Sequence, residues 1–154
     1  MRLHLCAVGR LRMGPERELL DDYLGRFERV GRALALGPVQ EHEVTARGGM
    51  RGEAEALGRA IPRGAATCVL DERGKTLSSP DFARLLARWR DQGRGDLAFV
   101  IGGADGLAPD LRANADYRLS LGAMVWPHML VRVLLAEQLY RAASILAGSP
   151  YHRA

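Results

Sequence analysis

The sequence has few of the residues that stabilise disulfide-linked or metal-binding domains. It contains two cysteines, Cys6 and Cys68, which share no CxxC spacing and have no histidine ligand pattern nearby. Both lie in apolar stretches typical of strands, so we interpret them as small buried hydrophobic residues in a reducing compartment. The cysteine pattern therefore indicates neither a disulfide framework nor a zinc site, and we expect no metal.

Long apolar runs are also missing. No apolar stretch reaches the roughly 20 residues that a membrane-spanning helix needs. The first residues, Met1 to Cys6, are too short and too strand-like for a signal peptide. We therefore expect no membrane partner and a cytoplasmic location.

Lysine is almost absent, so arginine supplies nearly all the positive charge. Lys75 is the only lysine among 22 basic residues, and the net charge of the 154-residue chain is +4. Arginine forks suit phosphate and nucleic acid better than lysine does. The excess is mild, however, and a chain rich in Arg, Ala and Gly is also typical of GC-rich coding sequence. Charge alone favours a nucleic-acid partner only slightly.

Apolar strands alternate with helical patterns along a chain of single-domain length, with no linker or repeat, which predicts one domain over residues 1–154. The strands read as continuous apolar runs, which indicates an α/β fold with a mostly parallel sheet flanked by helices on both faces. Strands are expected at 2–8, within 33–44, and at 65–70, 96–101 and 117–121; helices are expected at 15–30, at 53–61, from an N-cap at 79–81, from 109, and at 127–147, with a flexible basic loop at 45–52.

Three of the predicted strands end in residues that suit a binding site. The ends are Leu70-Asp71, Ile101-Gly102-Gly103 and Leu121-Gly122. Ligands of open α/β sheets bind outside the carboxyl ends of the strands, so neighbouring ends would form one crevice. The glycines of 102–106 match neither GxGxxG nor a P-loop. They would let the backbone approach a ligand, or they form an ordinary strand-to-helix turn.

The segment 122–127 places apolar side chains between a glycine and a proline. Such a loop can line an adenine-sized slot, where backbone groups read the ring edges, or it can simply pack beneath the last helix. That helix is apolar nearly all round and must be covered on more than one side, which favours a dimer. Within it, the spacing of Glu137 and Arg141 predicts a surface ion pair. Arg132 has no such helical partner.

Tyr151-His152-Arg153 stand just before the last residue, Ala154, and only three residues, 148–150, separate them from the last helix. These residues combine an aromatic surface, a base that titrates near neutral pH and a guanidinium fork for anions. A disordered polar end is the alternative interpretation.

Taken together, these residues resemble the RlmH family of small SPOUT-class methyltransferases, which act on large-subunit ribosomal RNA. The resemblance spans essentially the whole chain and is carried by 70–75, 101–103 with Gly106, 127–128 with Arg132, 137–142 and 151–153. It implies a C-terminal trefoil knot, an obligate homodimer and S-adenosylmethionine as cofactor. The implied substrate position is N3 of a pseudouridine in a stem-loop of the assembled ribosome.

The resemblance also suggests the roles of individual residues. The predicted cofactor-binding residues are Leu70, Gly102, Gly103, Leu121, Gly122, Ala123, Met124, Val125 and Trp126. The tail, Tyr151 to Arg153, is expected to complete the active site. There His152 is the candidate general base, and Arg153 or Arg141 steadies the developing negative charge or an RNA phosphate.

Two positions depart from the family pattern, and two rival functions stay open. Gly122 stands where a serine is common, and Val125 where a threonine is common. The first rival is another SPOUT-type methylation, of ribose 2′-O or guanine N1. The second is a ribosome-associated factor that binds nucleotide without catalysis. Because the charge excess is small, we expect a naked stem-loop to be a poor substrate.

Overall fold

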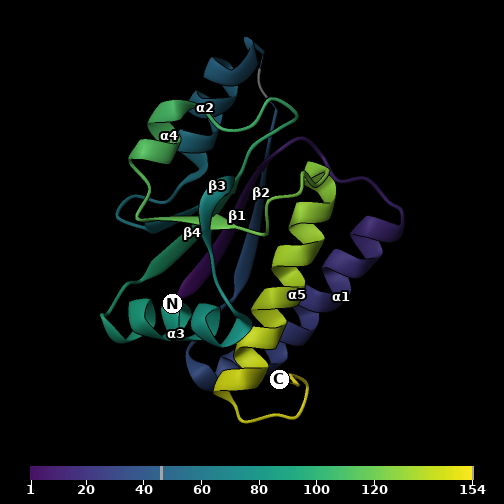
Figure 1. The fold of residues 1–154 in the computed structure, drawn as a ribbon, viewed down its shortest axis with the longest axis vertical. Helices are drawn as coiled ribbons and strands as arrows, with labels where there is room; N and C mark the ends of the chain where they lie inside the picture. Colours follow the sequence, from purple (N-terminus) through teal and green to yellow (C-terminus); the bar gives the residue numbers. More distant parts are fainter. Residues whose placement is uncertain (46, 154) are drawn as a thin grey trace.

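The computed structural model describes residues 1–45 and 47–153, which form an α/β fold in three layers (Figure 1). The strands are β1 Arg2–Val8, β2 Val39–Val44, β3 Ala66–Thr76, β4 Asp96–Ile101 and β5 Tyr117–Ser120. The helices are α1 Pro15–Gly31, a 3-10 turn η1 Arg32–Leu34, α2 Gly49–Ala60, α3 Ser79–Asp91, α4 Pro109–Ala113 and α5 His128–Leu146.

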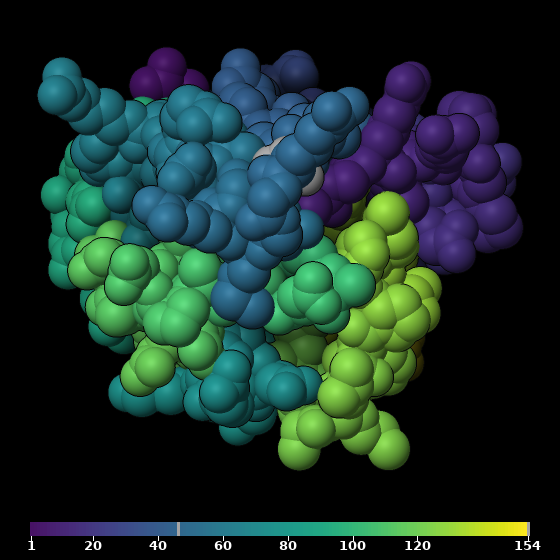
Figure 2. Space-filling model, turned by 90° about the horizontal axis from the view of Figure 1, so that it is seen from above, coloured from purple at the N-terminus to yellow at the C-terminus, as the bar shows by residue number. Residues whose placement is uncertain are grey.

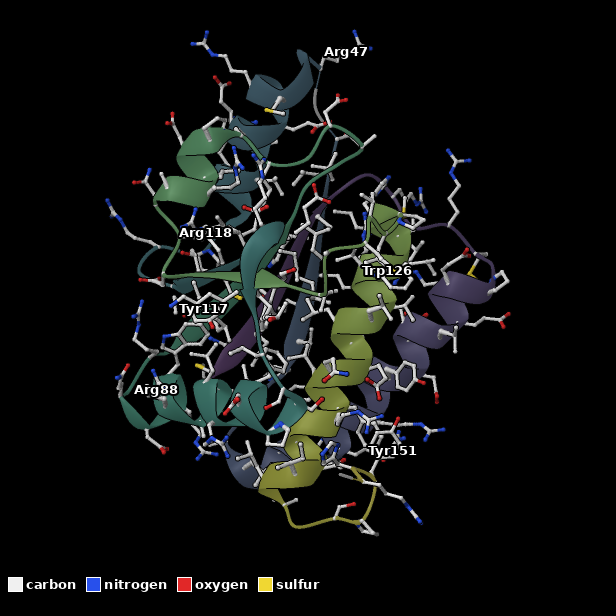
Figure 3. The ribbon with its side chains drawn as sticks, viewed as in Figure 1. Arg47, Arg88, Tyr117, Arg118, Trp126 and Tyr151 are labelled. Carbon is white, nitrogen blue, oxygen red and sulfur yellow. The ribbon has the colours of Figure 1, made fainter. Side chains whose placement is uncertain are left out.

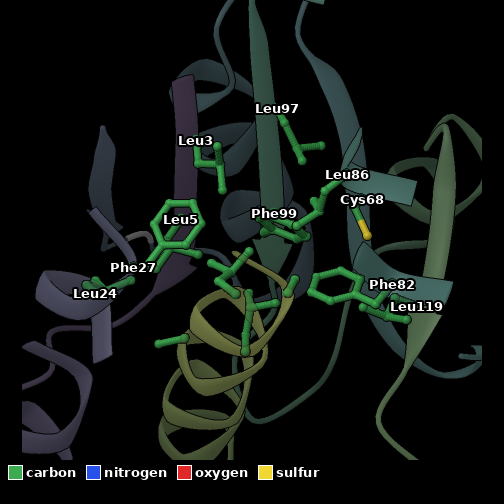
Figure 4. Packing of buried hydrophobic residues seen from close by; sticks show 14 of the residues in the cluster. Leu3, Leu5, Leu24, Phe27, Cys68, Phe82, Leu86, Leu97, Phe99 and Leu119 are labelled. Atoms are coloured by element: carbon green, nitrogen blue, oxygen red, sulfur yellow. The ribbon is translucent and has the colours of Figure 1, made fainter. Parts of the chain in front are cut away.

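All pairings in the five-stranded sheet are parallel, and the strand order is β2-β1-β4-β3-β5. Side chains alternate between the two faces of a strand, so each central strand contributes to two cores. Leu5 and Phe99 face α1, α3 and α5 in the larger core (Figure 4), whereas Cys6 and Val100 face α2 and α4. The predicted parallel sheet with helices on both faces is confirmed.

The loop expected at 45–52 is wrong over its second half, because α2 already begins at Gly49. Glycine disfavours helix on propensity alone, which is why the sequence suggested a later start at 53. In the structure, Ala56 and Leu57 bury one side of α2 against the sheet, and this packing supports a longer helix. Ala46, in the first half of the expected loop, lies outside the described residues.

Strand β3 continues to Thr76, six residues beyond its expected end at Leu70. Its pairing with β5 shifts register between Leu70 and Lys75 and then resumes. Gly74 lies in this irregular stretch, where a Cβ would come within 2.5 Å of the Arg118 carbonyl oxygen. Only glycine permits this close approach of β3 to β5.

The cap of α3 lies one residue earlier than expected. The Ser78 hydroxyl accepts a hydrogen bond from the Asp81 amide over 3.2 Å, so Ser78 is the N-cap and Ser79 begins the helix. Ser79 instead donates to Gln138 Oε1 over 2.8 Å and so joins α3 to α5.

The two cysteines are buried and unbonded, as expected. Burial raises the pKa of the Cys6 thiol to about 12 and also raises the pKa of Cys68, so both stay protonated at neutral pH. No helix among residues 1–45 and 47–153 has the length and hydropathy to cross a membrane. The trefoil knot that the resemblance implies stays a prediction.

Candidate active site

A cavity of about 320 Å³ lies where the carboxyl ends of β3, β4 and β5 meet. The three predicted strand ends all line it, so their expected convergence is confirmed. Seen from above, the green 102–106 segment lies between the blue α2 and the yellow-green start of α5 (Figure 2). The volume is in the range typical of sites for small molecules.

Most of the predicted cofactor-binding residues line this cavity. They are Leu70, Gly102, Gly103, Leu121, Gly122, Met124, Val125 and Trp126; of the predicted set, Ala123 alone is not among the lining residues that the structure describes. The side chains of Met124 and Val125 are 75% and 81% exposed, and Trp126 is 41% exposed. In a single chain the 122–127 loop therefore forms an open apolar rim and not a closed slot.

Gly102 and Gly103 are needed by the loop's own backbone. A Cβ on Gly102 would lie 2.7 Å from the Gly106 carbonyl, and one on Gly103 would lie 3.2 Å from Glu53 Oε1. The Gly106 amide donates to the Gly103 carbonyl over 3.0 Å and closes the turn. A side chain on Gly102 would therefore collide with backbone, whereas one on Gly103 would crowd the side chains of Glu53 and Val8.

Gly122 adopts a backbone conformation that suits glycine. Its φ is +114°, a value that L side chains rarely adopt. The buried Ser120 hydroxyl accepts a hydrogen bond from the Gly122 amide over 3.1 Å and supports this turn. The glycine at this departure from the family pattern is therefore matched to the loop, and a serine in the same backbone would be strained.

Three polar residues outside the predicted cofactor-binding set also line the cavity: Asp71, Arg112 and His128. Each has a buried atom with no hydrogen-bond partner in the described part of the chain, namely Asp71 Oδ2, Arg112 Nε and His128 Nδ1. In the sequence, Asp71 is marked only by its place at the predicted strand end Leu70-Asp71. Arg112 comes from the short helix α4, and only the fold brings it to the cavity.

Arg132 is fully buried and joins the start of α5 to the ends of two strands. Its guanidinium donates to Glu43 Oε2 over 2.8 Å, and to the carbonyls of Val8 and Gly9 over 2.8 and 2.7 Å. The acidic partner of Arg132, Glu43, lies on β2, so the spacing of residues within α5 could not reveal it. This network holds the first turns of α5, and with them His128, beside the cavity.

The tail is anchored to the second half of α5. The Tyr151 hydroxyl donates to Glu137 Oε1 over 3.0 Å, and the Arg141 guanidinium stacks 4.7 Å from the Tyr151 ring centroid. Desolvation, together with the Glu137 hydrogen bond, raises the pKa of Tyr151 to about 12, so its hydroxyl is protonated at neutral pH. The Glu137–Arg141 ion pair predicted from the spacing is present, and it also holds the tail.

His152 contacts Arg141 through one ring nitrogen. Arg141 Nη1 lies 3.3 Å from His152 Nδ1. Because a guanidinium can only donate, Nδ1 must accept, and the proton of the neutral ring is on Nε2. Arg153 follows as an exposed residue.

Within one chain the tail lies beside the second half of α5, whereas the cavity lies at the start of that helix. The tail's contacts, Glu137 and Arg141, come 9 and 13 residues after His128, and a rise of about 1.5 Å per residue places them roughly 14 to 20 Å along the helix. Trp126 lies at the start of α5 and Tyr151 beside its second half (Figure 3). The structure therefore brings the predicted cofactor residues together and, separately, the predicted catalytic residues.

Known proteins are similar to this chain over nearly its whole length. The family model described as "Predicted SPOUT methyltransferase" matches residues 1–152. The chain is 71% identical, over 99% of both chains, to the ribosomal RNA large subunit methyltransferase H of Roseobacter denitrificans. This chain belongs to the RlmH family of SPOUT methyltransferases. Its identity to the protein of the same name from Cereibacter sphaeroides is 70%, again over 99% of both chains.

A solved structure shares the fold of this RlmH-family chain. A probable methylase family protein from Haemophilus influenzae aligns with a TM-score of 0.53 and 10% sequence identity, covering 99% of this chain and 70% of that one. At so low an identity the match shows a common fold and nothing finer. It agrees with the parallel sheet and its flanking helices.

Proposed function

We propose that this chain is an S-adenosylmethionine-dependent methyltransferase that methylates N3 of a pseudouridine in large-subunit ribosomal RNA, on the assembled ribosome and as a homodimer. One observation carries the proposal. A cavity built from three strand ends occurs in a chain that is 71% identical, end to end, to a ribosomal RNA large subunit methyltransferase H. A ribosomal substrate would place its activity in the cytoplasm.

The cavity suits the cofactor. S-adenosylmethionine supplies an activated methyl group. The apolar rim of Leu121, Val125 and Trp126 fits the flat adenine ring, and the backbone of the 102–106 turn is open to its polar edge. The unpaired buried atoms of Asp71 and Arg112 offer polar groups to the rest of the molecule. The cavity thus offers an apolar surface for the adenine ring and polar groups for the rest of the cofactor.

The position of the tail supports a homodimer. A tail held roughly 14 to 20 Å along α5 from its own cavity would take part in the reaction at the cavity of a second copy. A two-fold pairing with antiparallel α5 helices would place each tail beside the partner's cavity. Exposed Met124, Val125 and Trp126, with the half-buried Leu130 and Leu134 on α5, give such a pairing an apolar surface.

His152 is the proposed proton acceptor. Pseudouridine N3 must lose its proton to become a nucleophile, and an imidazole near neutral pH can take it. Tyr151 is unsuited to this role because its pKa of about 12 keeps it a hydrogen-bond donor. Since Arg141 occupies His152 Nδ1, we expect substrate to draw Arg141 away toward phosphate or the developing negative charge. Arg153 is free to assist from its exposed position.

The mild net charge of +4 favours recognition of a preassembled ribosomal surface over tight binding of free RNA. The test incubates purified protein and labelled S-adenosylmethionine with ribosomes that lack the modification, followed by mass spectrometry of nucleosides. We expect 3-methylpseudouridine from ribosomes and little from the naked stem-loop. A ribose 2′-O-methyl or 1-methylguanosine product would support the first rival, and cofactor binding without any product would support the second.

The variant His152→Ala tests the proposed base. We expect turnover to fall at least about 100-fold while cofactor affinity is retained, since a general base contributes about that much. His42→Ala, which removes a histidine remote from the cavity lining, is the matched control and should keep its turnover. Unchanged turnover in His152→Ala would contradict the assignment.

A further inference from the structure

One wall of the cavity carries a buried carboxylate with an open acceptor. The Asp71 side chain is only 6% exposed, and its Oδ1 accepts from the Arg73 amide over 3.0 Å. Its Oδ2 is buried and has no hydrogen-bond partner among residues 1–45 and 47–153. Asp71 holds this position because it lies where β3 breaks its register with β5.

The opposing charge comes from α4. The Arg112 side chain is 20% exposed, and its Nη1 lies 3.8 Å from Asp71 Oδ2, which is too far for a hydrogen bond. Its Nε is buried and likewise unpaired within the described residues. The carboxylate and the guanidinium thus line the same cavity, close enough to neutralise each other but with one acceptor and one donor unused.

Buried charged groups are normally hydrogen-bonded, because leaving them unpaired costs free energy. A ligand that carries a cation and an anion a few ångströms apart would satisfy both groups at once. The other charged residues of the cavity lining, Glu72, Arg73 and Asp105, are exposed and need no such ligand. An α-amino acid carries an ammonium and a carboxylate on one carbon, which fits this arrangement.

We propose that Asp71 and Arg112 bind the α-amino-acid end of the cofactor, with Asp71 accepting from its ammonium group and Arg112 donating to its carboxylate. This inference rests on the proposed function, since it concerns the same cavity and the same cofactor. It makes the cavity two-sided: the 121–126 rim takes the adenosine, and the Asp71–Arg112 wall takes the amino acid. The pair would favour nucleosides that carry an α-amino acid over nucleosides that lack one.

The test compares two probes that differ only at this end. S-adenosylhomocysteine carries the amino acid, whereas 5′-methylthioadenosine keeps the nucleoside and thioether but lacks it. Isothermal titration of both probes is made into the wild-type protein, Asp71→Asn and Arg112→Met. We expect each variant to lose at least about tenfold in affinity for S-adenosylhomocysteine, with affinity for 5′-methylthioadenosine changed less than about twofold.

Arg118→Met is the matched control, because Arg118 is an exposed arginine that the cavity lining does not include (Figure 3). It should bind both probes like the wild type. Equal losses for both probes in the Asp71 and Arg112 variants would overturn the inference and assign the pair to the nucleoside or to cavity shape. If the Asp71 and Arg112 variants bind both probes like the wild type but bind ribosomes more weakly, the inference is overturned. Arg112 would then contact an RNA phosphate. A wild-type protein that binds neither probe would instead refute the proposed function itself.

Discussion

Arg132 Nη1 and Glu43 Oε2 lie 2.8 Å apart and join residues 89 positions apart in the sequence. Burial disfavours the Glu43 carboxylate, but hydrogen bonds from the Leu11 amide and Arg132 outweigh this and lower its pKa. The pair ties α5 to β2, while two further Arg132 bonds hold the carbonyls at the end of β1. The start of the helix beside the cavity is thus fixed by contacts to the opposite edge of the sheet.

Removing the buried guanidinium should destabilise the fold. We expect Arg132→Leu to lower the free energy of unfolding by about 3 kcal/mol, because it removes the buried guanidinium's hydrogen bonds to Glu43 and to two backbone carbonyls. Urea denaturation measures this. Arg51→Leu, which removes the exposed partner of Glu55 on α2, is the control and should change stability little. Equal effects of the two changes would contradict a structural role for the Arg132 network.

A mixture of two inactive variants should regain activity if the tail acts across the dimer. His152→Ala keeps the cavity but lacks the base, and Gly122→Val keeps the tail but strains the cavity loop at φ +114°. A mixed dimer would then hold one complete site, so random mixing should restore about a quarter of wild-type activity. Methyl transfer to ribosomes measures it.

The control for this experiment mixes His152→Ala with a chain that carries both substitutions, from which no arrangement yields a complete site. Titration must first show that Gly122→Val has lost cofactor binding. If the test mixture stays as inactive as the control, the tail acts within its own chain or not at all.

The two departures from the family pattern should behave differently when reverted. Gly122→Ser should cost about 1 kcal/mol of stability and weaken cofactor binding, since its φ of +114° strains any side chain. Val125→Thr should stay within about 0.5 kcal/mol, because that side chain is 81% exposed on the rim. Thermal denaturation and cofactor titration measure both effects. A fully stable Gly122→Ser protein would show that the loop adopts a different backbone with serine.

Stability should fall as the pH drops from about 7.5 to about 5.5, in part through His42. Burial and the neighbouring His4 lower the pKa of His42 below its ordinary 6.5. The unfolded chain therefore binds a proton before the folded chain does, so acidification through pH 6.5 favours unfolding. The groups around it are His4, which lies 3.0 Å away, and Asp96 with Arg2 beyond it.

Urea midpoints across this pH range for the wild type and His42→Gln measure the effect, and the variant should show a shallower slope. The same loss in both proteins would assign the pH dependence to other groups. Asp96 does not interfere, because hydrogen bonds from Arg2 and His4 lower its pKa below 3.8 and its contribution is lost only in stronger acid.

Several features of this protein follow from local sequence. The apolar runs of β1 and β4 predict buried parallel strands, because burial on both faces requires apolar residues at every position. The spacing of Leu20, Leu24 and Phe27 predicts α1 for the same local reason. The glycines after Ile101 and Leu121 mark strand ends, and the order of the blocks indicates the family. Each of these signals depends on residues within a few positions of one another.

Other features were decided by tertiary structure alone. The partner of Arg132, the meeting of Asp71 with Arg112 and the requirement for Gly74 all depend on segments that are distant in the chain. The separation of the tail from its own cavity depends on where the tail packs along α5, and the sequence does not show this position. Contacts between distant residues leave no periodic pattern in a single sequence. They are set by the order of the strands in the sheet and by the places where the helices pack on it.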